Sequence, residues 1–253
     1  MRVMLICLLF LTACDSLTIS PPTITETSPT DEHTVQWEMV TDGIEVEQFF
    51  GANTVLRAVR IDPQQYTFRA HYEAANPLTI AEWQTRLPDA QVIINANFFS
   101  VGNTVLGLLI SDGISYGRTY NDRGGTFFVD EDTVGLVSNL VDPYRSQTYS
   151  QAVQAFPMLM INGQAAYQNA DDTFPSRRTL IGIDENGYVV IMTTPGFGIG
   201  LYPLSQYLPS LNINLDIVMN LDGGGSTMMY IAANESVVQS FDPVPVVLAV
   251  YPH

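Results

Sequence analysis

Short apolar runs separated by turn residues dominate the sequence from Val35 onward, and they constrain its fold more than any other feature. Such runs are typical of β-strands. Asn162-Gly163 and Asn186-Gly187 each lie between two apolar runs, which is the strongest short-range indication of a β-hairpin. The predicted strands are Thr54–Ile61, Tyr66–Tyr72, Val92–Asn95, Leu106–Ile110, Thr126–Val129, Val134–Val137, Met158–Ile161, Leu180–Asp184, Tyr188–Met192, Ile217–Leu221, Met228–Ile231 and Val246–Val250.

Helical spacing of apolar residues is scarce. Thr79, as an N-cap before Ile80, Trp83 and Leu87, predicts one helix. A shorter second helix is predicted from Leu204, Tyr207, Leu208 and Leu211. We therefore expect a single α+β domain over residues 35–253, with one large, mainly antiparallel or mixed sheet that carries helices on one side.

The N-terminal residues have the pattern of a targeting segment. Arg2 precedes an apolar run that is too short to span a bilayer. Leu11-Thr12-Ala13-Cys14 then resembles a bacterial lipobox, so residues 1–13 are expected to be a lipoprotein signal peptide and Cys14 the lipidated residue. The alternative is an ordinary secretory signal cut near Ala13; both place the mature protein outside the cytoplasm, and lipidation would anchor it to the cell membrane or envelope.

Residues 14–34 follow as a tether that is rich in Ser, Thr and Pro and has little that could pack into a core. This segment and its N-terminal lipid would attach the domain to the membrane. The sequence makes no prediction about oligomeric state.

Charge excludes several partners and chemistries. The formal net charge is −16, which argues against nucleic acid as a partner because its phosphates demand clustered cations. All ten basic residues are Arg, so a phosphate-binding P-loop lysine, a Schiff base and a Ser-Lys dyad are excluded. An anion would have to be bound by guanidinium or backbone N–H groups.

Histidine and cysteine are nearly absent from the expected domain. His33 lies in the tether and His253 is the last residue, which leaves His71 as the remaining candidate base, and a structural role is expected for it. The two cysteines, Cys7 and Cys14, lie in the N-terminal segment. A thiol nucleophile or a histidine-based zinc site is therefore not expected.

Amides, arginines and carboxylates are what remain for a site, in three clusters. Asn95 and Asn97 close an apolar strand and either bind a ligand or cap a turn. Arg177 and Arg178 precede another strand, as an anion clamp or as solvated charges. Asp222 precedes three glycines, which suit either a tight turn or a close approach of ligand to backbone.

In combination these clusters resemble the phosphodiester glycosidase domain family. The resemblance covers roughly residues 92–250, and its last motif is the most specific. The motifs that carry it are Ile94-Asn95-Ala96-Asn97-Phe98-Phe99, Phe156-Pro157-Met158-Leu159, Arg178-Thr179-Leu180-Ile181-Gly182-Ile183-Asp184 and Asn220-Leu221-Asp222-Gly223-Gly224-Gly225-Ser226-Thr227.

The resemblance implies hydrolysis of a sugar C1–O bond with a phosphate ester as the leaving group, on envelope or exopolysaccharide glycans. A phosphate ester leaves as a stabilised anion and needs neutralisation of its charge more than a strong general acid. Asp222 would be the nucleophile or the base toward water, and Arg178, helped by Arg177, would hold the phosphate. The other implied substrate-binding residues are Asn95, Asn97, Thr179, Asn220, Gly223, Gly224, Gly225 and Ser226, with the glycine N–H groups facing the developing anion.

Two departures from the family pattern keep a second interpretation open. Thr193–Phe197 stands where relatives often carry an Asp-Gly pair, and the region around Asp242 and Val246 lacks an expected Arg and Asn. The alternative function is a surface lipoprotein that binds a glycan or a protein without cleaving it. No cofactor is required, although calcium or magnesium at Asp222, with Asp184 or Asp112 nearby, would suit oxygen ligands.

Overall fold

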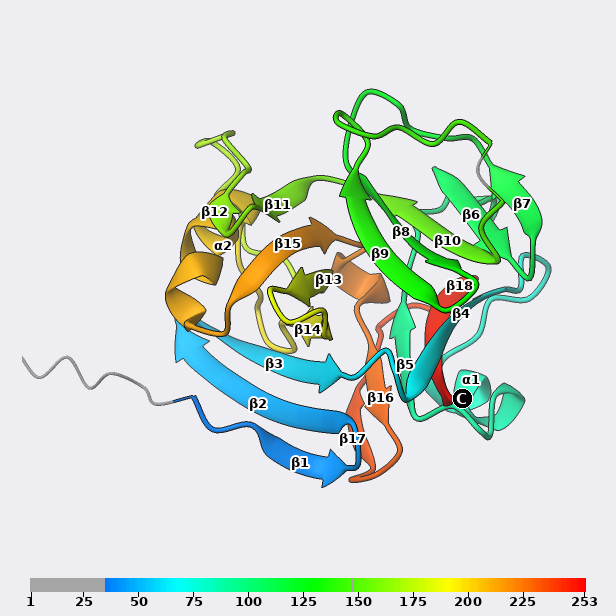
Figure 1. Cartoon of the computed structure of the whole chain (residues 1–253), viewed down its shortest axis with the longest axis horizontal. Coiled ribbons are helices and arrows are strands. Elements are labelled where there is room, and N and C mark those ends of the chain that lie inside the picture. Colours follow the sequence, from blue (N-terminus) through cyan, green and yellow to red (C-terminus); the bar gives the residue numbers. More distant parts are fainter. Residues whose placement is uncertain (1–34, 147) are drawn as a thin grey trace, which may run out of the picture. The chain divides into compact units, whose positions relative to one another are not determined.

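The computed structural model describes residues 35–146 and 148–253, which form one compact unit of three antiparallel sheets (Figure 1). The signal peptide and tether predicted for residues 1–34 lie outside the described residues. The first sheet has eight strands in the order β1 (Glu38–Thr41), β2 (Ile44–Gly51), β3 (Thr54–Ile61), β14 (Val189–Thr193), β13 (Thr179–Asp184), β15 (Leu215–Asn220), β11 (Met158–Ile161) and β12 (Gln164–Ala165).

The other two sheets have five strands each. The second has the order β7 (Ile114–Gly117), β6 (Leu108–Ser111), β10 (Gln151–Ala155), β8 (Gly125–Asp130) and β9 (Thr133–Ser138). The third has the order β17 (Ser236–Val238), β16 (Met229–Ile231), β5 (Val92–Asn95), β18 (Val246–Pro252) and β4 (Tyr66–Tyr72). Every predicted strand is present, with small differences at the ends.

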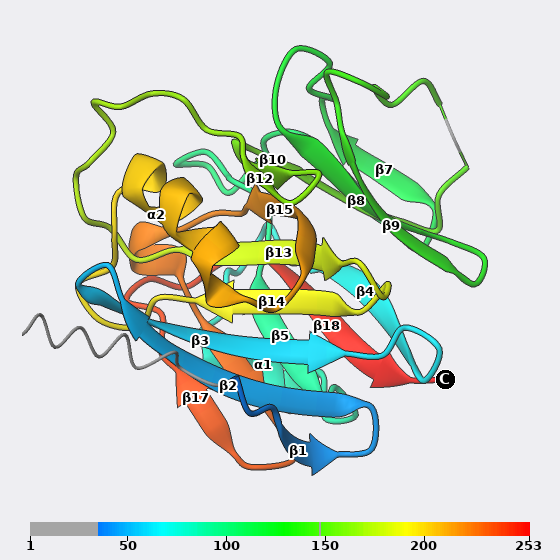
Figure 2. The same ribbon diagram turned by 60° about the vertical axis from the view of Figure 1, so that its left-hand side comes forward.

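The expectation of one large sheet with helices on one side is corrected by this arrangement. The antiparallel character is confirmed, but the strands divide among three sheets. The two α-helices cover different sheets: α1 (Ile80–Arg86) packs beside β5 and β16, and α2 (Leu201–Tyr207) beside β11 (Figures 1 and 2). The fold is therefore β-rich, and the α+β label fits it only loosely.

Local sequence explains the turns and caps. Asn162 and Gly163 have φ of 50° and 70°, as a two-residue hairpin loop between β11 and β12 requires. Thr79 caps α1 in a capping box with Glu82. The second predicted helix is α2, which continues as a 3-10 turn at Leu208–Leu211.

One hydrophobic core lies between the inner faces of the three sheets. It includes Ile61 of the eight-stranded sheet, Phe127 of the second sheet and Ile94 of the third. A separate cluster with Leu204 and Leu208 fills the space between the outer face of the eight-stranded sheet and α2. Burial of these side chains contributes about 1.5–3 kcal/mol each and holds the three sheets together.

In the described part of the chain, no helix is both long enough and apolar enough to cross a membrane.

Candidate active site

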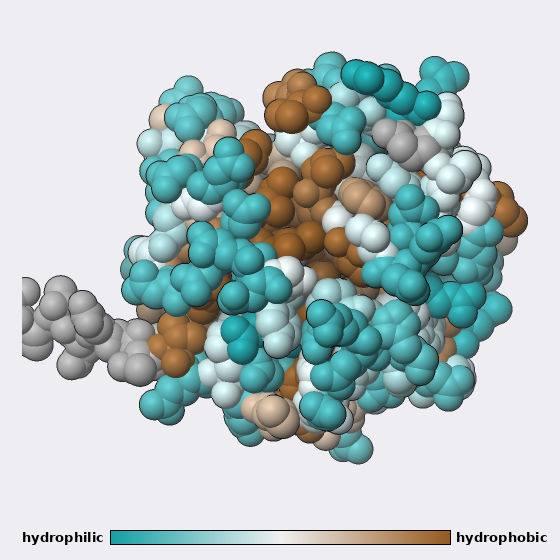
Figure 3. All heavy atoms as spheres, viewed as in Figure 1, coloured by the Kyte–Doolittle hydropathy of each residue, from teal (hydrophilic) through white to brown (hydrophobic). Residues whose placement is uncertain are grey.

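The three motifs singled out in the sequence meet where the three sheets come together. In the view of Figure 1 the C-terminal end of β15 lies near the centre of the face, where Figure 3 shows apolar residues exposed in a hollow. Leu180 pairs with Asn220, and beyond this pair the N–H of Leu221 donates to the carbonyl of Thr179 at 2.8 Å. The N–H of Gly224 then donates to the carbonyl of Arg177 at 2.8 Å, so the arginine and glycine motifs run side by side.

Asn95 joins this pair of segments to the third sheet. Its Nδ2 donates to the carbonyl of Asp222 at 2.6 Å. Its Oδ1 accepts the hydroxyl of Thr179 at 2.7 Å and the N–H of Met228 at 3.0 Å. Asn95 is buried, and these three bonds fix Thr179, Asp222 and Met228 relative to it; the contacts of Asn95 and Thr179 with substrate stay predictions.

Asn97 and Asn220 make analogous connections to the second sheet. The Nδ2 of Asn97 donates to the carbonyls of Leu108 and Gln154, both at 3.0 Å. The Nδ2 of Asn220 donates to the carbonyl of Phe156, just after β10, at 3.1 Å. The Oδ1 atoms of both asparagines are buried and accept no hydrogen bond from the described residues.

The glycine run is needed for close packing as well as for conformation. A Cβ at Gly223 would lie 2.6 Å from the carbonyl oxygen of Arg177, and Gly224 has a φ of 61°. The predicted anion nest is corrected for two of its three donors, because the N–H of Gly223 bonds to the Asp222 carboxylate and that of Gly224 to Arg177. Among the described residues only the N–H of Gly225 in this run has no acceptor.

Asp222 occupies an unusual environment for a carboxyl group. Burial raises its pKa to about 6, against the lowering effects of hydrogen bonds from the Ser226 side chain and the Gly223 N–H. The Gly223 bond measures 2.9 Å. No ion pair joins Asp222 to an arginine anywhere in the described ranges. A carboxyl group with such a pKa exchanges protons near neutral pH, as catalysis requires.

Arg177 is a buried cation with no carboxylate partner within the described residues. Its side chain is 5 % exposed, and burial lowers its pKa. One terminal nitrogen, Nη2, donates to the carbonyls of Thr227 and Gln239 at 3.0 and 2.7 Å, while Nε and Nη1 have no acceptor among the described residues. The ring of Phe241 lies 4.4 Å from the guanidinium carbon. The site thus has an unneutralised positive charge beside the glycine run.

The side chain of Arg178, which is expected to hold a phosphate, is half-buried. Its Nε donates to the carbonyl of Ile199 at 3.0 Å. Burial lowers its pKa, and the charges of Asp172 and Tyr167 oppose that shift. Arg178 therefore has an acidic neighbour of its own, which makes Arg177 the better candidate for an external anion.

A cavity of ≈ 520 Å³ opens beside Arg177. Its lining includes Ser176, Gly224, Phe197 and Phe241. The carboxylate of Asp242 lies against Gly225, at the far end of the glycine run from Asp222. Of the lining residues, the sequence motifs identified Arg177 and Gly224 as site residues but not Phe197 or Phe241, although Phe197 falls in one of the two regions that depart from the family pattern.

Asp184 and Asp112, the two carboxylates named beside Asp222 for a divalent cation, have contacts of their own, and the cation stays a prediction. Asp184 lies at the opposite end of β13 from the site and accepts the N–H groups of Asn186 and Tyr188. Asp112 pairs with Arg69 at 3.0 Å. In the described part of the chain, no group of three or more His, Cys, Asp or Glu side chains could hold a metal ion.

His71 lies on β4, and its Nε2 is 3.0 Å from the hydroxyl of Tyr251. Burial, reinforced by the charge of Arg69 and opposed by that of Asp112, lowers its pKa. The ring of His71 is thus packed against Tyr251, and its structural role stays a prediction.

Comparisons with known proteins give a family match and a shared fold. The sequence profile of the phosphodiester glycosidase family matches residues 88–251, which include all three motifs. No match was found among curated proteins.

Two solved structures share the fold. The catalytic domain of zebrafish N-acetylglucosamine-1-phosphodiester alpha-N-acetylglucosaminidase, auto-inhibited by its pro-peptide, is 17% identical with a TM-score of 0.60, over 83% of this chain and 82% of that one. A hypothetical protein from Synechocystis is 16% identical with a TM-score of 0.58, over 84% of this chain and 63% of that one.

Proposed function

This chain belongs to the phosphodiester glycosidase family, and from that membership we propose that it hydrolyses the glycosidic bond of sugar-1-phosphodiesters. The observation that carries the proposal is the buried guanidinium of Arg177, which lacks a carboxylate partner and lies beside the glycine run that follows Asp222. A phosphate group would supply the missing negative charge. In a chain with a net charge of −16, an unneutralised buried cation points to an anionic ligand.

The proposed reaction breaks the bond between C1 of the sugar and the phosphate oxygen. Water contributes OH to C1 and a proton, and the phosphate monoester leaves with the bridging oxygen. Arg177, with Arg178 at the adjacent position, neutralises the charge that grows on the leaving group. Asp222 acts at C1, either as the nucleophile or as the base toward water, and Ser226 and Gly223 hold its carboxylate.

The direct test is release of free sugar from a panel of sugar-1-phosphodiesters, with and without a chelator. Product stereochemistry followed by NMR distinguishes the two roles of Asp222, since a nucleophile retains the anomeric configuration and a base inverts it. Release from none of the panel would reject the proposal and leave a ligand-binding protein in its place. Activity lost with chelator and restored by calcium or magnesium would add a metal to the site.

The two arginines provide a matched pair of variants. We expect Arg177→Gln to lower kcat/KM for a phosphodiester by about 10²–10³-fold, because it removes the charge nearest the glycine run. Arg178→Gln should lower kcat/KM by a smaller factor, since Asp172 is already close to that cation. An aryl glycoside, which lacks the phosphate, should be far less sensitive to either change.

Two outcomes would contradict this assignment of the phosphate. One is an equal loss for Arg177→Gln on phosphodiester and aryl glycoside, and the other is a larger loss for Arg178→Gln. Arg177→Lys keeps the charge without the planar fork and controls for damage to folding.

We also propose that the chain is an extracytoplasmic lipoprotein anchored through Cys14, because the sequence of residues 1–14 has the lipobox pattern. Mass spectrometry of the mature N-terminus checks this. A lipidated Cys14 is expected, and an unmodified mature protein that begins near Ala13 or Cys14 would contradict it.

A further inference from the structure

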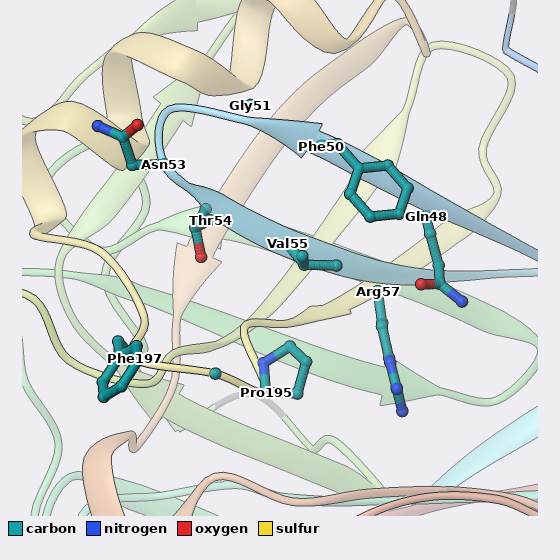
Figure 4. A pocket seen from close by; sticks show the side chains of 10 residues that line it. Gln48, Phe50, Gly51, Asn53, Thr54, Val55, Arg57, Pro195 and Phe197 are labelled. Atoms are coloured by element: carbon teal, nitrogen blue, oxygen red, sulfur yellow. The ribbon is translucent and has the colours of Figure 1, made fainter.

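A second cavity lies next to the one beside Arg177. It has a volume of ≈ 760 Å³ and lies between the β2–β3 hairpin and the loop Pro195–Phe197, which also lines the first cavity (Figure 4). Figure 4 shows Pro195 and Phe197 facing the hairpin that carries Phe50 and Arg57. A single loop thus separates two adjoining cavities, and Gly224 of the catalytic motif lines the first of them.

Large exposed aromatic side chains surround these cavities. Phe50 is 73% exposed, Phe197 97% and Phe241 77%. All three are lining residues of one cavity or both. Exposure of single apolar side chains is common in proteins, but three large ones around two cavities that share a lining loop would suit an apolar ligand.

Cationic groups lie among these aromatics. The Nε of Arg57, which lines the second cavity, is buried and has no acceptor among the described residues. The hydroxyl of its cross-strand partner Thr193 is likewise buried and unbonded within that part of the chain. Arg177 lines the first cavity, and its Nε and Nη1 are likewise buried without an acceptor among the described residues. An anion beside an apolar chain would match this arrangement of charge and aromatic surface.

We propose that the two cavities form the subsite for the leaving group, and that this leaving group is a phosphate ester of a long apolar alcohol. The inference rests on the proposed function and names its substrate class, a lipid-linked sugar phosphodiester. The phosphate lies at Arg177 and Gly224, and the apolar chain crosses Phe197 toward the hairpin cavity. Phe50, Phe197 and Phe241 are the residues that select an apolar over a hydrophilic alcohol.

The experiment measures binding of the expected leaving group, so it does not depend on turnover. Calorimetry with the mature protein compares decyl phosphate, below its micellar concentration, with methyl phosphate. Decyl phosphate should bind at least about tenfold more tightly, because its chain is removed from water. Phe197→Ser should abolish most of this preference, whereas Arg177→Gln should weaken both ligands to a similar degree.

Ile114→Ser is the matched control, since Ile114 is 59% exposed and lies on β7 of the second sheet, away from both cavities. It should keep the full preference for decyl phosphate. Equal affinities for the two phosphates would overturn the inference, as would a preference unaffected by Phe197→Ser or equally reduced by Ile114→Ser. Loss of binding to phosphatidylglycerol vesicles in Phe197→Ser, with the decyl preference unchanged, would also overturn it in favour of a membrane-contacting surface. Failure of the proposed hydrolysis is recognised separately, by the absence of sugar release.

Discussion

Asp222→Asn is expected to lower kcat on a sugar-1-phosphodiester by about 10²–10⁴-fold while the protein stays folded. The amide keeps the size of the side chain and can still accept the N–H of Gly223, which lies 2.9 Å from the carboxylate. It cannot attack C1 or take a proton from water. Steady-state kinetics on the wild type and the variant measure the loss, and circular dichroism verifies the fold.

The same variant should be more stable than the wild type at neutral pH. Burial raises the pKa of Asp222 from 3.8 to about 6, so this carboxyl group favours the folded state fully below about pH 3.8 and loses that contribution as the pH rises through 6. A shift of this size corresponds to at most about 3 kcal/mol. Because the group is partly exposed, we expect the free energy of unfolding to rise by about 1–2 kcal/mol at pH 8 and to change little at pH 3.

Asp242→Asn is the control for both measurements. Asp242 is an exposed carboxylate at the other end of the same glycine run. It should keep activity within about threefold of the wild type, because water and salt screen an exposed charge of this kind. Wild-type turnover in Asp222→Asn would remove Asp222 from the mechanism, and an equal loss in Asp242→Asn would make the pair of carboxylates the catalytic unit.

Asn95→Leu is expected to destabilise the protein by about 3–5 kcal/mol and to abolish activity together with stability. The substitution keeps the branching of the side chain at Cγ but removes three hydrogen bonds, to Thr179, Asp222 and Met228. Two of the groups left behind belong to the backbone and would be buried without partners. Urea unfolding followed by fluorescence gives the change in free energy.

Thr179→Val tests one of the three hydrogen bonds of Asn95 separately from the other two. It removes the hydroxyl that Asn95 accepts at 2.7 Å but leaves the other two bonds of the amide in place. We expect the free energy of unfolding to fall by about 1 kcal/mol. If Asn95→Leu lowered the free energy of unfolding no more than Thr179→Val does, the Asn95 amide would not hold the chain at Thr179, Asp222 and Met228 together as the geometry indicates.

The strands that sequence reasoning found are mostly short apolar runs bounded by clear turn residues, such as Val92–Asn95 and Met158–Ile161. It did not find β10, whose five buried residues include Gln151 and Gln154. These glutamines are satisfied by partners distant in sequence; for example, the Gln154 Oε1 accepts the N–H of Leu108. Polarity at a buried position is understandable only once such partners are known.

The division of the strands into three sheets could not be predicted from the sequence either, for a related reason. Each hairpin signal fixes a local pair of strands, whereas β3 pairs with β14 across more than half of the domain. Such pairings follow from long-range packing and leave no local pattern.

For the site, the motifs located the right segments but not the roles of all their side chains. Asn95, Asn97 and Asn220 look like ligand contacts in sequence, yet their Nδ2 groups donate to backbone carbonyls. Arg177 and Arg178 are adjacent in the chain and cannot be ranked until one of them is seen to have an acidic neighbour. Phe197 and Phe241 lie in none of the sequence motifs.

The three hydrogen bonds of Asn95 have a consequence for how the protein acquires activity as it folds. Asn95 belongs to one sheet and Thr179 to another, and the amide of Asn95 fixes the chain at Asp222 between them. A folding intermediate in which each sheet is formed but not yet docked would contain every catalytic residue and have no competent site. Recovery of turnover during refolding should therefore coincide with the last, slowest assembly step, because contacts between residues far apart in sequence form late.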